Sequence, residues 1–339
     1  MMKQLIISAR RIFAVGLLAA IAMSVPALAY SIQDKNKPAQ PSADEQKALS
    51  KVQNAPTLAA KLEAAKEYMK KYSKGVERFK LAQYMVAEVA KSTDAATQIS
   101  SSETLMTIFN DPKETLLISG ILIDGYVKAT RGEDAFRVGA THLEKAPGDV
   151  AILTQLSIFG IEQAKRGNAN FVQQSQTYGA KAIELIEADK MPENFEAATW
   201  TEYKTRWLPQ LYQSLGIVSY MMKNTDDAQA KLEKAASLNP NDPFTYAILG
   251  TLANDEYQKY AQQYKNLMAG PVKDEALKRA HTKMDAVIDY FAHAVGLAEG
   301  NTAYQALHDQ LMEDLKTYYQ ARKGSLDGLQ ELINKYKKQ

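Results

Sequence analysis

Apolar residues recur every three or four positions along most of this chain, the spacing that places them on one side of an α-helix. One example lies between residues 57 and 72, where the apolar stripe consists of Leu58, Leu62, Ala65 and Met69. Runs of β-branched residues are short, whereas Ala, Leu, Lys, Glu and Gln dominate. The pattern therefore predicts an all-α protein.

The strongest pattern lies between residues 209 and 299. Residues 210–243 predict a helix, a polar turn, a second helix and a proline stop. Small residues, Gly216 on the first helix and Ala228 on the second, allow a close crossing, with Tyr212, Leu215 and Leu232 around it. The first helix then repeats after 34 residues, with the counterparts Tyr246, Leu249 and Gly250.

These positions resemble the tetratricopeptide repeat (TPR) family, whose helical hairpins repeat about every 34 residues. The resemblance implies a solenoid of stacked hairpins over residues 44–299, followed by C-terminal capping helices in 300–339. The clearest units are 116–149, 209–242 and 243–299. The sequence departs from the family pattern at the second aromatic position of the last two units, where it has Ser219 and Ala253.

Several segments depart from a regular repeat. The last unit predicts an extended hairpin, with a first helix that reaches Met268, a turn at Gly270 and a long return helix. The Ser- and Thr-rich stretch 91–103 predicts the weakest ordered region, followed by a short helix at 105–109. An inserted helix is expected over 192–207, with Pro209 opening the next unit, and Ser325 is expected to cap the last helix.

The N-terminal residues have the features of a bacterial signal peptide. Basic residues, the last of them Arg10 and Arg11, precede an apolar run over 12–25, and Ala27–Ala29 offers small residues for cleavage. We therefore expect a signal peptide at 1–29, cleavage after Ala29, export to the periplasm or out of the cell, and a flexible linker at 30–43. Both general secretory and twin-arginine export fit this segment. No later run is apolar enough to predict a membrane span.

Charge and cysteine content exclude several function classes. The formal net charge is +2, and removing Lys3, Arg10 and Arg11 with the signal peptide leaves −1. With no dense basic stretch, this balance argues against a nucleic-acid partner. The chain has no cysteine, which excludes disulfides, thiol nucleophiles and thiolate metal sites. No metal or other cofactor is expected.

The TPR resemblance implies that a ligand binds in a concave groove lined by the first helix of each hairpin. Seven candidate groove residues follow from it: Gln210, Gln213, Ile217, Tyr220, Phe244, Thr251 and Asn254. Amide and aromatic side chains suit an extended or helical peptide segment. The expected function is a non-catalytic scaffold or adaptor that binds a protein or peptide partner in the cell envelope. This hypothesis requires that Gln213 and Tyr220 are not buried between helices.

Other side chains leave alternatives open. Trp200, Tyr203 and Trp207 could bind a small molecule or glycan, although packing between hairpins explains the same spacing. A second tyrosine set, Tyr257, Tyr260 and Tyr264, could form an interaction surface or pair with the return helix. Four potential metal ligands share one helix, namely His281, Asp285, Asp289 and His293. The two histidines would lie about 18 Å apart along the helix axis, too far to bind one ion.

An enzyme remains the alternative from another class, with a site between the repeats and the long hairpin. The sequence contains no Gly-rich phosphate loop after a strand and no His-Glu-x-x-His motif. No Ser/His/Asp set or pair of carboxylates is recognisable from sequence spacing. The expectation is therefore a protein without catalytic residues.

Overall fold

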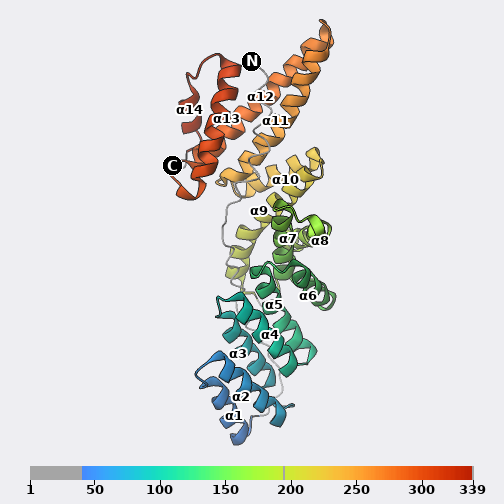
Figure 1. Cartoon of the computed structure of the whole chain (residues 1–339), viewed down its shortest axis with the longest axis vertical. Coiled ribbons are helices and arrows are strands. Elements are labelled where there is room, and N and C mark those ends of the chain that lie inside the picture. The colour runs from blue at the N-terminus through green and yellow to red at the C-terminus, as the bar shows by residue number, and fades with distance from the viewer. Residues whose placement is uncertain (1–39, 194, 338–339) are drawn as a thin grey trace. The chain divides into compact units, whose positions relative to one another are not determined.

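A computed structural model describes residues 40–193 and 195–337 (Figure 1). Within these ranges the secondary structure consists of α-helices and short 3-10 turns, without strands. The predicted all-α class is therefore confirmed. The expected signal peptide at 1–29 and most of the linker at 30–43 lie outside the described residues.

The chain divides into two compact units, one within Ile21–Glu202 and the other within Tyr203–Gln339, so the boundary falls inside α9. The first unit contains α1 (Ala43–Gln53), α2 (Leu58–Lys71), α3 (Arg78–Ala90), α4 (Ala95–Ile108), α5 (Pro112–Lys128), α6 (Gly132–Lys145), α7 (Val150–Lys165) and α8 (Val172–Glu187). The second contains most of α9 (Ala197–Met221), then α10 (Thr225–Leu238), α11 (Pro243–Asn266), α12 (Pro271–Ala298), α13 (Gln305–Lys323) and α14 (Leu329–Asn334).

Helices that follow one another in the chain pack as pairs, among them α1 with α2, α5 with α6, α7 with α8, and α11 with α12. Polar side chains fix where many helices begin, because a free N–H group of the first turn needs an acceptor. Ser42, Thr57, Asp94, Asp111, Asp149, Asn224 and Asp242 each accept such a bond. These caps allow short connections and therefore antiparallel neighbours.

The predicted close crossing at Gly216 is confirmed. A Cβ atom at this position would lie 2.8 Å from Cγ of Leu232 and 3.3 Å from the carbonyl oxygen of Ala228. Its counterpart Gly250 is equally confined, since a Cβ atom there would lie 2.4 Å from ring atoms of Phe291 on α12. Glycine therefore brings the two helices together in both hairpins.

Two predicted helix boundaries are wrong. The stretch 91–103 is not weakly ordered, because Asp94 caps α4, which runs from Ala95 to Ile108. The inserted helix does not stop before Pro209 either: α9 continues through it to Met221. An internal proline costs about 3 kcal/mol, but Trp207 and Leu211 on either side of it are buried, and their burial offsets this cost.

The C-terminal helices differ from the prediction in detail. Helix α11 ends at Asn266, two residues before the predicted end. Gly328, in a left-handed conformation, precedes α14, whereas Ser325 exchanges hydrogen bonds with Asp327 in the preceding turn. The long hairpin is as expected: α11 has 24 residues and α12 has 28, against 14 in α10. Across the described part of the chain, no helix is long and apolar enough to cross a membrane.

Candidate functional site

The seven predicted groove residues lie on α9 and α11, which belong to the same compact unit. They differ sharply in exposure. Gln210 is exposed, and Gln213, Tyr220 and Phe244 are half-buried. In contrast, Ile217, Thr251 and Asn254 are only 2%, 1% and 5% exposed. The structure therefore leaves four of the seven residues within reach of a ligand.

Gln213 links α9 to the start of α11. Its Nε2 atom donates to Oδ2 of Asp242 and, at 2.6 Å, to Oγ1 of Thr245. Asp242 is itself the N-cap of α11 and accepts from the backbone N–H of Phe244 at 3.1 Å. The position of Gln213 is thus fixed by the cap of the neighbouring first helix.

Tyr220 forms a second link between the same two helices. Its hydroxyl donates to Oδ2 of Asp255 at 2.6 Å. Burial raises the pKa of Tyr220, and the hydrogen bond to Asp255 raises it further. The phenol therefore remains a protonated donor at neutral pH. Asp255 is exposed, so this pair lies at the surface and Tyr220 is not enclosed between helices.

The inaccessible residues are covered by the protein's own side chains. Asn254 accepts a hydrogen bond at 2.5 Å from the hydroxyl of Tyr318, a residue of α13 that is 1% exposed. Thr251 donates to the carbonyl oxygen of Ala247 at 2.9 Å. The expectation that Ile217, Thr251 and Asn254 face an open groove is therefore wrong, because core packing and α13 occupy that side. The four accessible groove residues, together with Asp255, form a surface that we call the α9–α11 strip: Gln210, Gln213, Tyr220, Phe244 and Asp255.

The tryptophans proposed as an alternative ligand site are buried. Trp200 is 3% exposed; its Nε1 atom donates to Oδ1 of Asp189 at 2.8 Å, and its ring meets Phe195 edge-on. Trp207 is 8% exposed, and the guanidinium of Arg206 lies 4.6 Å from its ring centre. Neither ring lines an accessible slot.

Of the three tyrosines on α11, Tyr260 and Tyr264 lie beside the return helix, the second of the two uses expected for them, whereas Tyr257 packs against α13. Tyr257 is 6% exposed and meets Tyr318 of α13 edge-on. Tyr260 and Tyr264 face the return helix, with Arg279 5.9 Å from the first ring and Lys273 4.9 Å from the second.

Three of the four potential metal ligands on α12 contact different partners, and the fourth, His281, is exposed. Asp285 forms an ion pair with Arg322 at 2.9 Å, and Asp289 accepts from the hydroxyl of Tyr336. His293 is stacked between Tyr246 and Tyr336, with ring centres 3.6 and 4.1 Å away. The described residues contain no group of three or more His, Asp or Glu that could hold a metal ion.

The structure brings together a set that sequence spacing did not reveal. Nδ1 of His142 lies 2.7 Å from Oγ of Ser119, and its Nε2 lies 2.9 Å from Oδ2 of Asp149. Ser119 is nevertheless poorly placed to act as a nucleophile. Ser119 is 7% exposed and lies inside α5, where backbone N–H groups are used in the helix and cannot stabilise an oxyanion. Since Asp149 also caps α7, the set joins α5, α6 and α7 structurally.

A second buried polar cluster surrounds Asp124, which is 3% exposed. It accepts from Nε2 of Gln98 at 2.7 Å and of Gln155 at 3.2 Å, and Nζ of Lys128 lies 2.6 Å away. These contacts connect α4, α5 and α7. Burying a carboxylate requires such partners, and sequence periodicity gives no indication of them.

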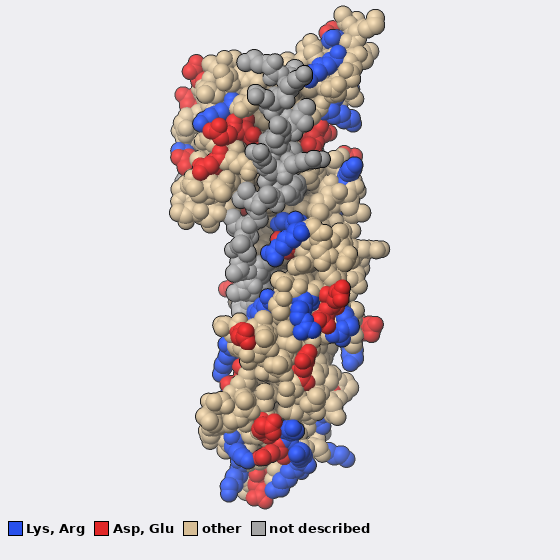
Figure 2. All heavy atoms as spheres, in the orientation of Figure 1, with Lys and Arg blue, Asp and Glu red and all other residues tan. Residues whose placement is uncertain are grey.

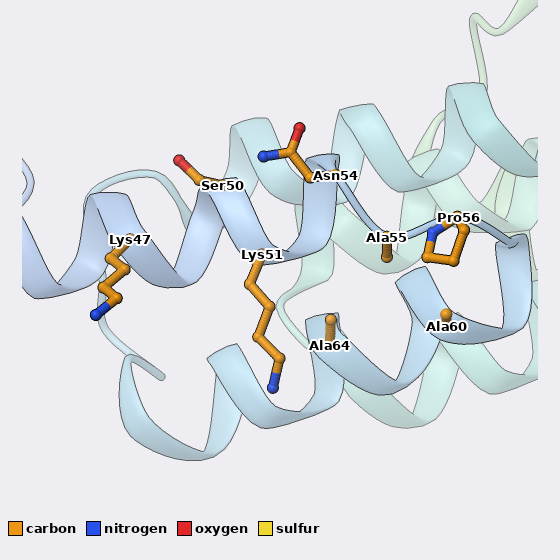
Figure 3. Close-up of a pocket in the computed structure, with 8 residues that line it drawn as sticks. All are labelled: Lys47, Ser50, Lys51, Asn54, Ala55, Pro56, Ala60 and Ala64. Carbon is orange, nitrogen blue, oxygen red and sulfur yellow. The ribbon is translucent and has the colours of Figure 1, made fainter.

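The N-terminal hairpin carries a shallow pocket of about 490 Å³. Figure 3 shows Lys47 and Lys51 of α1 beside it, with the small side chains Ala60 and Ala64 of α2 opposite. Lys51 is ion-paired with Glu67. The pocket contains no carboxylate, imidazole or tyrosine among its lining residues, so it offers few groups for chemistry or for oriented binding.

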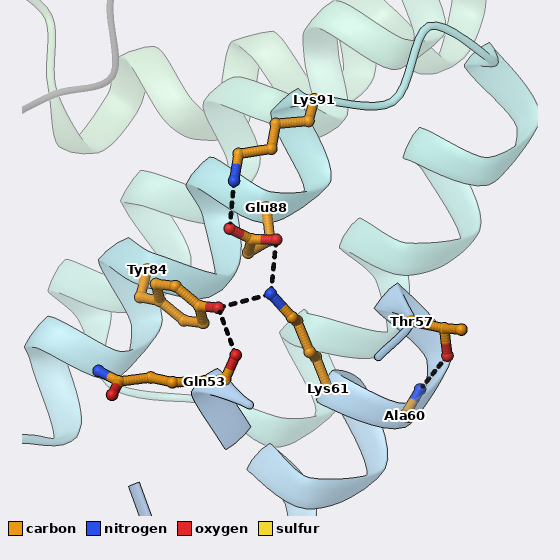
Figure 4. Close-up of polar contacts among 7 residues, drawn as sticks. All are labelled: Gln53, Thr57, Ala60, Lys61, Tyr84, Glu88 and Lys91. Carbon is orange, nitrogen blue, oxygen red and sulfur yellow. Dashed lines mark hydrogen bonds and ion pairs between the residues drawn. The ribbon is translucent and has the colours of Figure 1, made fainter. Parts of the chain in front are cut away.

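Beside this hairpin, Lys61 joins α2 to α3 (Figure 4). Its Nζ atom donates to the hydroxyl of Tyr84 at 2.6 Å and to Oε2 of Glu88 at 2.8 Å. These two hydrogen bonds raise the pKa of Lys61, and the bond from Lys61 lowers the pKa of Glu88. The cluster has the geometry of a structural link between helices.

Comparison with models of known protein families and with curated protein sequences finds no match for this chain.

Proposed function

We propose that this protein is a non-catalytic interaction scaffold built from TPR-like hairpins. The observation that carries the proposal is the repeated crossing: Gly216 and Gly250, 34 residues apart, both leave no space for a Cβ atom against the following helix. Such hairpins cannot bury their apolar faces alone, and their stacks present extended surfaces that bind other proteins.

The α9–α11 strip is the binding surface we infer within this scaffold. It combines an exposed amide at Gln210, the half-buried rings of Tyr220 and Phe244, and the exposed carboxylate of Asp255. Amide hydrogen bonds together with aromatic contacts suit an extended or helical segment of a partner protein. Because the strip contains a carboxylate and no basic residue, it favours a segment with a nearby positive charge.

The cell envelope is the proposed location, and it depends on the expected signal peptide at 1–29. Sequencing the N-terminus of the mature protein tests this part separately. A chain that begins near Tyr30 supports export, whereas a retained Met1 contradicts it.

Site-specific photocrosslinking in the native cell tests the surface itself. A benzophenone amino acid replaces Gln210 in one variant and Gln229 in the control. Gln229 is an exposed glutamine on α10, so residue type and unit are matched. An adduct with one discrete protein at 210, weak or absent at 229, supports the proposal. Equal adducts at both positions, or adducts at 229 alone, place binding elsewhere.

A further inference from the structure

The turn between α11 and α12 exposes apolar side chains at the end of the long hairpin. Met268 is 88% exposed and Val272 is 69% exposed, the largest fractions for any bulky apolar residue in the described chain. Gly270 and Pro271 stand between them, and Pro271 is also exposed. Figure 1 shows this turn at the free end of the hairpin, beyond α10 and α13 of the same unit. Turns of soluble proteins usually carry polar residues instead.

Basic residues outnumber acidic ones in the helical segments next to this apolar turn, although Asp274 and Glu275 follow it directly and Glu275 forms an ion pair with Arg279. The stretch 259–279 contains five basic side chains and two acidic ones, a net charge of +3, against −1 for the whole chain after the expected cleavage. The basic residues are Lys259, Lys265, Lys273, Lys278 and Arg279. On the face drawn in Figure 2 the end of the hairpin is uncharged, and both basic and acidic side chains lie behind it.

The turn is held in a defined conformation. Nζ of Lys273 donates to the carbonyl oxygen of Leu267 at 3.0 Å and lies 4.9 Å from the ring centre of Tyr264. Gly270 adopts a φ of 147°, which favours glycine. Met268 and Val272 thus remain directed to solvent, since the turn that carries them is tied to both helices.

We propose that this turn, residues 267–273, docks the protein on an anionic lipid surface. Exposed Met and Val side chains can enter the boundary between headgroups and acyl chains, where their burial is favourable. Lysines behind them would then lie at the level of the lipid phosphates, and an anionic surface attracts such residues. Tyr264, in the last turn of α11, suits the interface between lipid and water. The excess of basic residues in 259–279 favours an anionic lipid surface, because a purely apolar partner would not require it.

Vesicle sedimentation tests this inference directly. The chain after the expected cleavage, residues 30–339, contains every described helix and lacks the apolar N-terminal run, which could itself bind lipid. It is mixed with vesicles of phosphatidylcholine alone or with about one-third phosphatidylglycerol. We expect binding to the anionic vesicles at least tenfold stronger than to the neutral ones, weakening as salt rises.

Two variants and one control assign the binding to the turn. Met268→Asp/Val272→Asp removes the apolar side chains, and Lys265→Gln/Lys278→Gln removes two exposed charges; each is expected to weaken binding at least tenfold. Met222→Asp is the matched control, because Met222 is 61% exposed in a turn of the same unit, and it should leave binding unchanged. Circular dichroism of all variants confirms that the helices remain folded.

Three results would overturn the inference: no binding of the wild type to anionic vesicles, equal binding to neutral vesicles, or binding that the Met268→Asp/Val272→Asp variant retains. A photocrosslink from position 268 to a protein, without vesicle binding, would assign the turn to a protein partner instead. This outcome is independent of the crosslinks at Gln210, so failure here leaves the scaffold proposal intact.

Discussion

Replacing Gly250 with alanine should destabilise the long hairpin, although alanine is the better helix former. A Cβ atom at 250 would lie 2.4 Å from two ring atoms of Phe291, where carbon atoms prefer a separation of 3.5–4.0 Å. Phe291 is 3% exposed, so its ring cannot swing into solvent. Overpacking of this kind costs about 1–3 kcal/mol, and the helix propensity of alanine returns about 1 kcal/mol. The expected net loss is therefore up to about 2 kcal/mol.

A double-mutant cycle isolates the clash. In a Phe291→Leu background the ring is absent, so Gly250→Ala should become neutral or stabilising by up to about 1 kcal/mol. The control Gly120→Ala, on α5, has no atom within 4 Å of the new Cβ and should stabilise its own unit by about 1 kcal/mol.

Urea unfolding measures these free energies, with hydrogen exchange of α11 and α12 peptides to locate the change. Local measurement matters, because two compact units need not unfold as one. If the effects of Gly250→Ala and Phe291→Leu were additive, or if Gly250→Ala stabilised the wild type as Gly120→Ala does, the close approach of α11 to Phe291 would be refuted.

Three further predictions concern polar groups at Arg78, Asp124 and His293, and Arg131 serves as an exposed control. Arg78→Ala leaves the carboxylate of Glu114, which is 2% exposed, without its two hydrogen bonds of 2.6 and 2.7 Å from Arg78. It should lower the free energy of unfolding, measured in urea, by about 2–3 kcal/mol. The control Arg131→Ala removes an exposed ion pair and should lower it by under about 1 kcal/mol. Asp124→Ala removes the acceptor of two buried amides and should cost about 2–4 kcal/mol by the same assay; a loss below about 1 kcal/mol would contradict the network. Burial lowers the pKa of His293 in the folded protein. As pH falls, the imidazole of His293 is therefore protonated in the unfolded chain before it is protonated in the folded one. Wild-type stability should therefore decrease below pH 6.5, and His293→Phe should lose that part of the decrease; identical pH profiles would contradict it.

Much of the fold could be predicted, because the signals are local. Apolar spacing along 57–72 is the buried face of α2, where Leu62 and Met69 are both 9% exposed. Small residues at Gly216 and Ala228 mark a real crossing, since close approach of two helices needs both. In both cases the residues that carry the sequence pattern are the same residues that make the contact.

Prediction failed where packing overrides local preference. Serine and threonine are weak helix formers, and their number in 91–103 led to the prediction of a weakly ordered region. Ser102 is nevertheless completely buried in α4, and helix packing outweighs the poor propensity. The predicted helix boundary at Pro209 was wrong for the same reason. A proline usually ends a helix, but the buried side chains around Pro209 keep α9 continuous.

The predicted groove failed in part because its cover comes from a distant stretch. Asn254 is bonded to Tyr318, 64 residues further along the chain. Under the TPR resemblance, position within a repeat predicts which residues face a concave side, but not whether a later helix covers them. Ser119, His142 and Asp149 present the converse case: three residues that no spacing connects meet through the packing of α5, α6 and α7.

The α9–α11 strip and the exposed turn, both in one unit, share helix α11. Asp255 precedes Met268 by 13 residues, which corresponds to about 20 Å along a helix. If both proposals hold, a segment bound at the strip would lie about this far from the lipid surface when the hairpin stands upright on it. The two activities would then be compatible, since a helical or extended segment about 10 Å wide fits in that space. Crosslinking at Gln210 should accordingly persist in the presence of anionic vesicles; its loss on vesicle binding would mean that lipid and partner compete for the same surface.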